Sequence, residues 1–305
     1  MNLIQKLQKE IFNLTGGYIA TWLPDFDPFI GDFGAIARGR LLTDGNLEEL
    51  GYIDAQKFIG VSSTKSFKYT SDVSISAESS GGPALGYVVT FNKEGSFIYH
   101  FQNAAHHRIE NKRAFFKELA HKILTGVIPW DDSYVIVDEV FIAETSTILI
   151  SKSSKGVVNI KSDGSVKEIP NFADSKLNLA FSISKGTIFD YAGQTDTRPL
   201  FHAVKPTIKP KGSVGGTRGP KPTGPSLSSF YDYAKRLVKD RDIKPTEIEL
   251  YAVEDNLLEA VLTLNGRSAK FDIVFENLTP DYIMKDNLGD EEEIIAIENV
   301  LVFGD

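Results

Sequence analysis

The chain has 305 residues, of which 33 are Lys or Arg and 41 are Asp or Glu, so its formal net charge is −8 at pH 7. A hydrophobic share of 42% and a charged share of 24% are typical of a folded globular protein. The absence of cysteine excludes disulfides, thiolate catalysis and cysteine-ligated metals. No apolar run approaches the roughly 20 residues of a transmembrane helix, and the N-terminus lacks the apolar core of a signal peptide. We therefore expect a cytoplasmic protein.

The charge is unevenly distributed along the chain. Residues 1–204 carry −3, residues 205–225 carry +5 and residues 226–305 carry −10. A nucleic-acid-binding protein presents a concentrated basic face, whereas the basic residues concentrate here in one Gly- and Pro-rich segment. We expect no nucleic-acid partner.

The first 204 residues begin with a predicted helix that ends at Gly16-Gly17. Its apolar residues recur at helical spacing: Leu3, Ile4, Leu7, Ile11, Phe12 and Leu14. Residues 66–79, SFKYTSDVSISAES, alternate in the way that predicts strands. Residues 86–101, GYVVTF–NKEG–SFIYHF, predict a hairpin around a Gly-containing turn, with one aromatic-rich face on each side of the turn.

A second helix is predicted over residues 109–124, and strand-like runs follow over residues 134–161 and 176–205. Strands outnumber helices, and they succeed one another at hairpin distances. This pattern predicts an α+β domain over residues 1–204, with a mostly antiparallel twisted sheet and flanking helices.

Residues 205–225, KPTIKPKGSVGGTRGPKPTGP, contain five glycines and five prolines and predict a flexible linker. The linker is either a simple spacer or an exposed cleavage site, for which Lys211 and Arg218 are candidate processing residues. Residues 226–305 predict a small acidic α+β domain. It comprises a helix over residues 226–240 and a three-stranded meander over residues 246–276, with a turn at Asn265-Gly266.

Motifs of nucleotide-binding, metalloprotease and serine-hydrolase sites are absent from the sequence. Two groups of residues offer weak alternatives. His106, His107 and His121 would bind zinc only if they met a carboxylate such as Glu110 or Glu118, and their spacing favours ordinary surface histidines. The acidic pairs Asp25/Asp27 and Asp131/Asp132 favour turns with side-chain-to-backbone hydrogen bonds. We predict no catalytic, cofactor or metal residues, although an enzyme whose site converges only in space stays open.

In the order of its segments, the region 1–204 resembles the pore-forming domain of gasdermins, particularly the small bacterial members. The likeness begins with LIQKLQKEIFNLTGGYIATWLP, an amphipathic helix that leads into a Gly-Tyr strand. It continues through SFKYTSDVSIS, ALGYVVTFNKEGSFIYHF and YVIVDEVFIAETSTILISKSSKGVVNI, and ends with KEIPNFADSKLNLAFSISKGTIFDYAGQTDTRPLFHAVK. About two-thirds of the chain is covered, and the likeness includes no diagnostic short motif.

The resemblance implies an autoinhibited protein of a bacterial defence or cell-death system. A protease would sever the C-terminal region, and the freed domain would move to the membrane, bind lipids, associate with further copies and form a pore. Departures from the family are the 80 residues that follow the linker and the missing N-terminal cysteine. The alternative is a non-enzymatic two-domain adaptor, in which the C-terminal meander recruits a protein partner and the linker is a tether.

Overall fold

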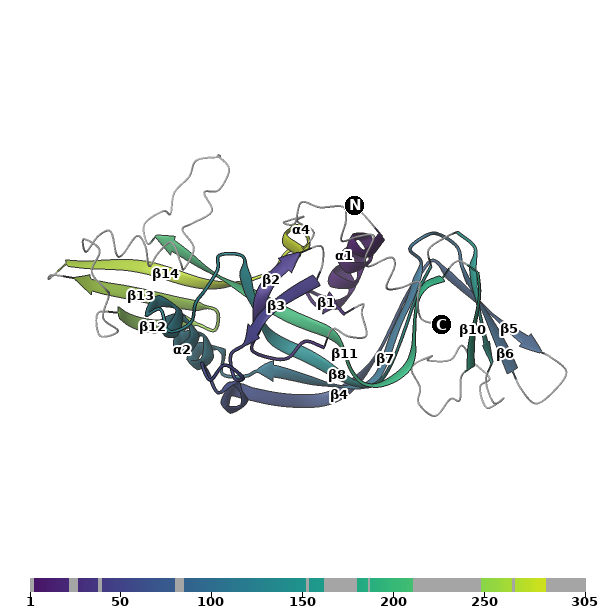
Figure 1. Ribbon diagram of the computed structural model, residues 1–305, viewed down its shortest axis with the longest axis horizontal. Helices are drawn as coiled ribbons and strands as arrows, with labels where there is room; N and C mark the ends of the chain where they lie inside the picture. The colour runs from purple at the N-terminus through teal and green to yellow at the C-terminus, as the bar shows by residue number, and fades with distance from the viewer. Residues whose placement is uncertain are drawn as a thin grey trace.

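The computed structural model describes residues 3–21, 27–37, 40–79, 85–151, 154–161, 180–185, 187–210, 248–264 and 267–283 (Figure 1). Most of them lie in antiparallel strands, and few lie in helices, which confirms the predicted α+β class. The helices are α1 (Leu3–Thr15), α2 (Lys112–Leu124) and the short α4 (Pro280–Ile283), with a 3₁₀ turn at Ala55–Phe58.

The strands form two sheets. The strands before α2 are β1 (Ile19–Ala20), β2 (Asp32–Ala37), β3 (Arg40–Asn46), β4 (Ile59–Ser71), β5 (Val73–Ser79), β6 (Leu85–Phe91) and β7 (Phe97–Ile109). Those after it are β8 (Tyr134–Ser151), β9 (Gly156–Lys161), β10 (Ala180–Lys185), β11 (Thr187–Pro210), β12 (Ile248–Glu254), β13 (Leu257–Leu264) and β14 (Arg267–Asn277). Ten of them form one long sheet with the order β12-β13-β14-β11-β8-β2-β3, to which β7, β4 and β1 add beside β8, β7 and β11.

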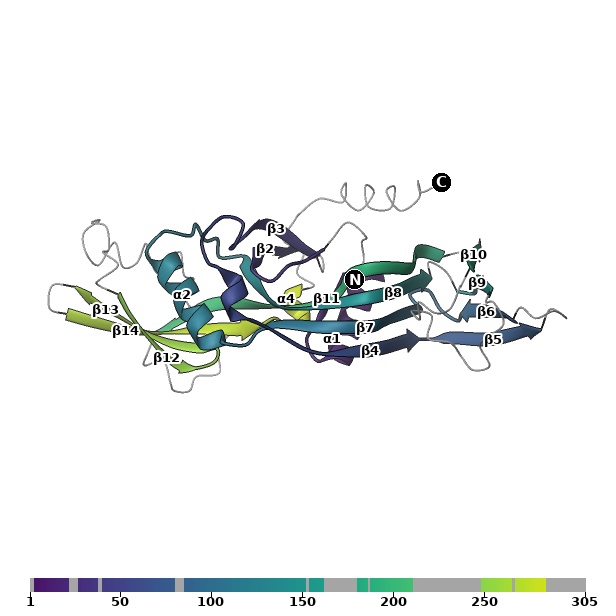
Figure 2. The same cartoon turned by 90° about the horizontal axis from the view of Figure 1, so that it is seen from below.

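The other four strands form a second sheet, with the order β10-β9-β6-β5, at one end of the molecule (Figures 1 and 2). This sheet continues the long one strand by strand, because β4 leads into β5, β6 into β7, β8 into β9 and β10 into β11. The chain therefore forms two long neighbouring hairpins, and all four strands are interrupted at the same level. We call this level the bend, and we call the strand pairs that lie beyond it, β5 with β6 and β9 with β10, the first and second arms.

The two inner strands cross the bend in register with each other. Phe97 pairs with Ile150 on one side of the bend, and Phe91 pairs with Gly156 on the other. Each inner strand thus uses five residues, 92–96 or 151–155, between equivalent pairs. The outer strand of the first hairpin uses a single residue, Asp72, because Ser71 still pairs with Phe97 and Val73 pairs with Phe91.

This arrangement corrects the hairpin that we expected around the sequence NKEG. The segments 85–91 and 97–109 are β6 and β7, which do not pair with each other but are successive parts of one long strand. The Gly-containing segment between them changes the strand's direction without reversing it. The two predicted aromatic-rich faces are nevertheless present, since they lie in two different buried clusters.

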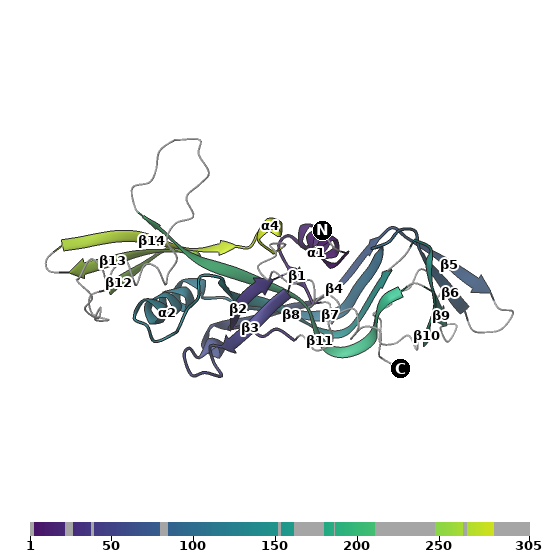
Figure 3. The same cartoon turned by 45° about the horizontal axis from the view of Figure 1, so that its top comes forward.

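Helix α1 covers one face of the long sheet, on the side opposite to α2, β2 and β3 (Figure 3). Leu7 and Ile11 of the helix are buried against aromatic side chains of β7 and β8. The helix ends at Gly16 and Gly17, whose φ angles of 76° and 121° suit glycine alone. The side chain of Gln8 pairs with both backbone groups of Ala20 (2.7 and 2.9 Å) and so fixes β1 beside the helix.

The C-terminal strands share the core of the rest of the protein. One buried cluster joins residues of α2, β2, β8 and β11 with residues of β12, β13 and β14. At its centre the ring of Phe116 in α2 stacks on Phe275 in β14. The region 248–283, which we expected to belong to a separate small domain, thus continues the same sheet, although the three predicted strands of its meander are present.

The last part of β11 replaces the first part of the predicted linker. Residues 205–210 were expected to be flexible, yet they pair with β14, from Lys205 opposite Glu276 to Pro210 opposite Phe271. The prolines in this stretch suggested a linker, but the buried side chain of Ile208 anchors it as a strand. The outer edge of β11 is therefore covered twice, by β1 at residues 200–201 and by β14 at residues 204–210.

Candidate functional site

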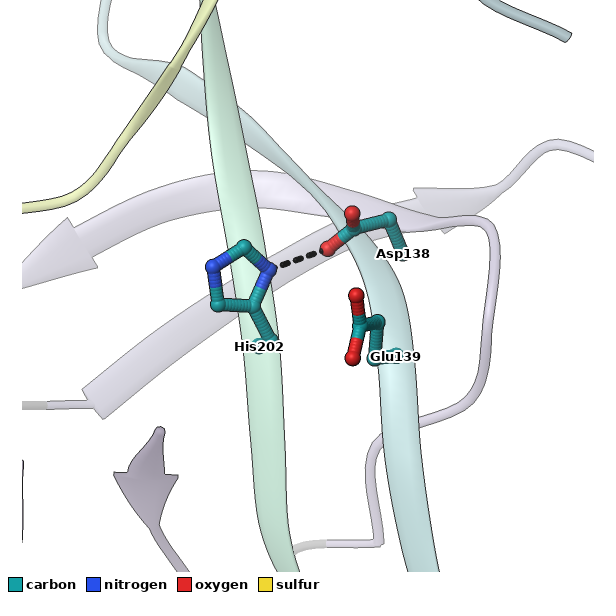
Figure 4. Close-up of side chains that lie close together, drawn as sticks. All are labelled: Asp138, Glu139 and His202. Carbon is teal, nitrogen blue, oxygen red and sulfur yellow. Dashed lines mark hydrogen bonds and ion pairs between the residues drawn. The ribbon is translucent and has the colours of Figure 1, made fainter. Parts of the chain in front are cut away.

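An irregularity in β8 brings two carboxylates to one place. Ala203 pairs with Val137, and the preceding His202 pairs with Glu139, so Asp138 is an extra residue in β8. Such a bulge lets adjacent side chains leave the usual alternation of a strand. Asp138 and Glu139 consequently lie side by side next to His202 (Figure 4).

Lys112, the first residue of α2, lies between the two carboxylates. Its ammonium nitrogen is 2.9 Å from Asp138 Oδ2 and 2.8 Å from Glu139 Oε1. Asp138 is fully buried, and its second oxygen accepts a hydrogen bond of 2.6 Å from His202 Nδ1. Both oxygens of this buried carboxylate are therefore bound by side-chain donors, as a buried charge requires.

The second oxygen of Glu139 faces α1. It accepts a hydrogen bond of 2.5 Å from the hydroxyl of Tyr18, and it lies 2.9 Å from His106 Nε2. The ring of Tyr18 also meets His106 and His202 edge to face. Because Tyr18 follows the glycines that end α1, these contacts connect the helix to the middle of the sheet. We call Tyr18, His106, Lys112, Asp138, Glu139 and His202 the ionic cluster.

The cluster shifts the pKa values of His202, Lys112, Glu139 and Tyr18. Burial alone would lower the pKa of His202 and of Lys112, but Asp138 and Glu139 together outweigh burial and raise both. Burial would raise the pKa of Glu139, yet hydrogen bonds from His106, Lys112 and Tyr18 hold it well below its usual range. Burial and the hydrogen bond to Glu139 raise the pKa of Tyr18, so its hydroxyl keeps its proton.

Asp138, Glu139 and His202 could in principle bind a metal ion, since one ligand atom of each lies within 4.8 Å of the others. Lys112 argues against this use of the site. Its ammonium group bridges both carboxylates and already supplies the positive charge that a metal would bring. A divalent cation would have to displace a partly buried lysine that bridges both carboxylates, so the residues do not fit a metal centre. The geometry is that of a charge-balanced cluster that holds α1 and α2 against the sheet.

The arms form a second notable feature, because their two faces differ in polarity. The side chains that share one face are apolar: Val73, Ile75, Tyr87, Val89, Phe91 and Val158. This face packs back across the bend against Ile98 and Leu149 of β7 and β8, which are fully buried as a result. The opposite face carries the exposed Ser74 and Ser76 together with Thr90 and Asn159, although Val88 and Val157 also belong to it.

The structure places the predicted site residues as follows. Lys211, Arg218 and Asp25 lie outside the described residues. Asp131 accepts hydrogen bonds from the backbone and hydroxyl of Ser133, which confirms the turn expected there. His106 contacts Glu139 and Tyr18, whereas Glu118, a candidate partner of the histidines, pairs with Lys122.

The sequence carries a local signal for the ionic cluster. Asp138 and Glu139 are adjacent acids within the apolar run YVIVDEVFIA. In a regular strand one of them must point into a buried face, which is costly without a partner. Adjacent acids in such a run therefore indicate either a bulge or a buried cation. The sequence does not reveal that Lys112 and His202 supply the partners, because they come from distant segments.

Among the described residues, no helix has the length and apolar character to cross a membrane. Comparisons with protein families, with curated proteins and with solved structures found no match to this chain.

Proposed function

We propose that the protein forms pores, that its two arms swing out at the bend and insert side by side into a membrane, and that the C-terminal strands hold it inactive. The observation that carries this proposal is the apolar face of the arms, which packs across the bend against Ile98 and Leu149. A strand that crosses a membrane alternates apolar, lipid-facing residues with residues that face the pore. The arms have this alternation.

The length of the arms supports the same conclusion. The described strands have seven residues each in the first arm (β5 and β6) and six residues each in the second arm (β9 and β10). A tilted transmembrane strand needs about 9–11 residues. Each inner strand, β6 or β9, reaches this length together with the five residues that it uses at the bend.

The pairing across the bend supports joint insertion of the two arms. Because the inner strands use five residues each at the bend, they keep the same register when the bend straightens. The outer strand of the first hairpin has only one residue at the bend, so it must slide by four residues relative to its inner neighbour. Four is an even number, so the side chains of the outer strand stay on the same face. Straightening therefore preserves the separation of apolar and polar faces.

Basic residues at the bend suit the surface of a membrane. Lys93 and Lys155 lie at the bend, and the side chain of Lys93 is 69% exposed. With the arms inserted, these lysines would meet the head groups, where cations attract anionic lipids. The partners of this activity are anionic lipids and further copies of the chain.

The C-terminal strands fit the role of a restraint. They pair with β11 over seven residues and share a core with α2, so they hold the protein in its folded state. A protease that cuts between residues 211 and 247 would make their loss irreversible. The resemblance to gasdermins suggests that this event belongs to a defence or cell-death response, and we include that role in the proposal.

Dye-loaded liposomes with anionic lipids test the proposal. Protein that is cut between residues 211 and 247 and freed of the C-terminal strands should release the dye, and uncut protein should not. Ile75→Glu places a charge on the apolar face of β5 and should abolish release, whereas Ser76→Glu places it on the opposite face and should not. If the freed protein stays folded and releases no dye, the pore proposal is wrong, and a tethered binding role becomes the better explanation.

A further inference from the structure

Backbone conformation at the bend sets it apart from the rest of the sheets. Three described residues other than glycine have a positive φ angle: Asp72 at 50°, Asn103 at 51° and Lys155 at 69°. Two of these three, Asp72 and Lys155, lie at the bend. A left-handed conformation brings the side chain's Cβ too close to the backbone. Glycine adopts it freely, Asp and Asn adopt it at a smaller cost than other residues, and Lys155 has no such advantage.

The same two residues connect the strands at the bend. The carbonyl of Asp72 accepts a hydrogen bond of 2.8 Å from the amide of Asn92, and the amide of Lys155 donates one of 2.8 Å to the carbonyl of Phe91. The carboxylate of Asp72 also pairs with Lys93 at 2.9 Å, but this pair is largely exposed to solvent. An exposed ion pair contributes little.

In a straight strand, Asp72 and Lys155 would both adopt the extended conformation that residues other than glycine prefer. The local backbone at these positions thus favours a straight strand, while the burial of the arms' apolar face favours the bent one. The two tendencies oppose each other at the same place in the molecule.

We infer that Asp72 and Lys155 form a strained hinge, which stores a bias toward the extended arms and sets how often they open. This inference rests on the proposed function for its biological meaning, but opening of the arms is measurable without a membrane. Glycine at either position should relax the bent state and close the arms more firmly. A β-branched residue, which tolerates the left-handed conformation poorly, should open them more often.

Opening of the arms can be followed by thiol labelling, because the chain has no cysteine of its own and an introduced cysteine is the single reactive thiol. Val89 of β6 is fully buried in the cluster beneath the arms. In the full chain, a thiol introduced by Val89→Cys should react with a soluble reagent only when the arms open, so its rate of labelling reports the open fraction. Ala120→Cys, at a fully buried position in α2, reports global unfolding in the same way.

We expect Asp72→Val to raise the labelling rate at position 89 about tenfold and Lys155→Gly to lower it by a similar factor, without a change at position 120. Asp72→Gly should act in the same direction as Lys155→Gly but by a smaller factor, because aspartate tolerates this conformation better than lysine. Asp72→Asn, which keeps a residue tolerant of this conformation, and Lys93→Gln, which removes only the ion pair, should have small effects.

Equal labelling rates at position 89 in Asp72→Gly, the parent and Asp72→Val would overturn the hinge. Equal acceleration at positions 89 and 120 would also count against it, because the substitution would then act on global stability. If Asp72→Val does not fold, the two glycine variants still decide, since they must slow labelling. If the protein releases dye but the substitutions at positions 72 and 155 leave the labelling rate at position 89 unchanged, the hinge is wrong and the pore stands. If these substitutions change the labelling rate but the protein releases no dye, the pore is wrong and the hinge stands.

Discussion

The ring of Phe116 in α2 lies parallel to the ring of Phe275 in β14, with centroids 4.0 Å apart and an interplanar angle of 10°. Both side chains are almost completely buried. This contact joins the region before residue 210 to the region after residue 248, and it accompanies the seven paired residues of β11 and β14. The C-terminal strands are therefore held by a shared core as well as by the covalent chain.

A cut in the chain alone should not separate the two regions. We expect protein cleaved at a protease site placed between residues 211 and 247 to elute from gel filtration as one species containing both fragments. The reason is that β14 stays paired with β11 and packed on α2. Fragments that part in buffer without denaturant would show that the shared core is too weak to hold them.

Replacing the ring on β14 should weaken this attachment. Phe275→Ala should reduce the free energy of unfolding by about 3–5 kcal/mol, as removal of a fully buried aromatic ring does. Urea unfolding followed by fluorescence measures the change. Tyr251→Ala, at a position in β12 that is 51% exposed, is the control and should change stability by less than about 0.5 kcal/mol. Similar losses for the two variants would contradict the packing described.

Removing one charge from the ionic cluster should be costly. Glu139→Gln leaves Asp138 as the single carboxylate for Lys112 and His202, so we expect a loss of about 3–5 kcal/mol in the free energy of unfolding. Glu144→Gln, on an exposed position of the same strand, should be nearly neutral. If both substitutions were neutral in urea unfolding, the cluster would not hold the helices to the sheet.

The stability should depend on pH through His202. Its pKa is raised in the folded protein because of Asp138, against the effect of burial. The stabilisation from its proton is thus fully present below about pH 6.5, the value for unfolded histidine. It decreases by at most about 1.4 kcal/mol for each pH unit above that value, until the raised pKa is passed.

Urea unfolding of the parent and of His202→Gln between pH 6 and pH 9 measures this contribution. The difference in the free energy of unfolding between the two proteins should shrink as the pH rises. His107→Gln offers a contrast, because burial, Arg198 and His106 lower the pKa of His107, which places its effect below pH 6.5 with the opposite sign. Parallel curves for the parent and His202→Gln would show that His202 does not share a proton-dependent pair with Asp138.

Local sequence patterns predicted those parts of the fold that local forces determine. The helices at residues 3–15 and 112–124 and the three C-terminal strands follow from spacing, glycines and caps within a few residues. The segment NKEG misled the prediction, because its turn residues serve equally well in a reversal and in a bend. Which of the two forms depends on pairing with β9, some 65 residues further along the chain.

The candidate site was less predictable for a related reason. The bulge at Asp138 arises from a mismatch between β8 and β11, and its partners Lys112 and His202 come from segments on either side in the sequence. Adjacent acids in an apolar strand are a local sign that something unusual occurs. The identity of the compensating cations is a property of the whole fold.

Both ends of the described chain meet on one strand. β1 and β14 lie in tandem on the outer edge of β11, at residues 200–201 and 204–210. A product that is truncated at either end would therefore expose backbone donors and acceptors of the same edge, and such an edge recruits other strands. Loss of either β1 or β14 should thus favour aggregation through the exposed edge of β11.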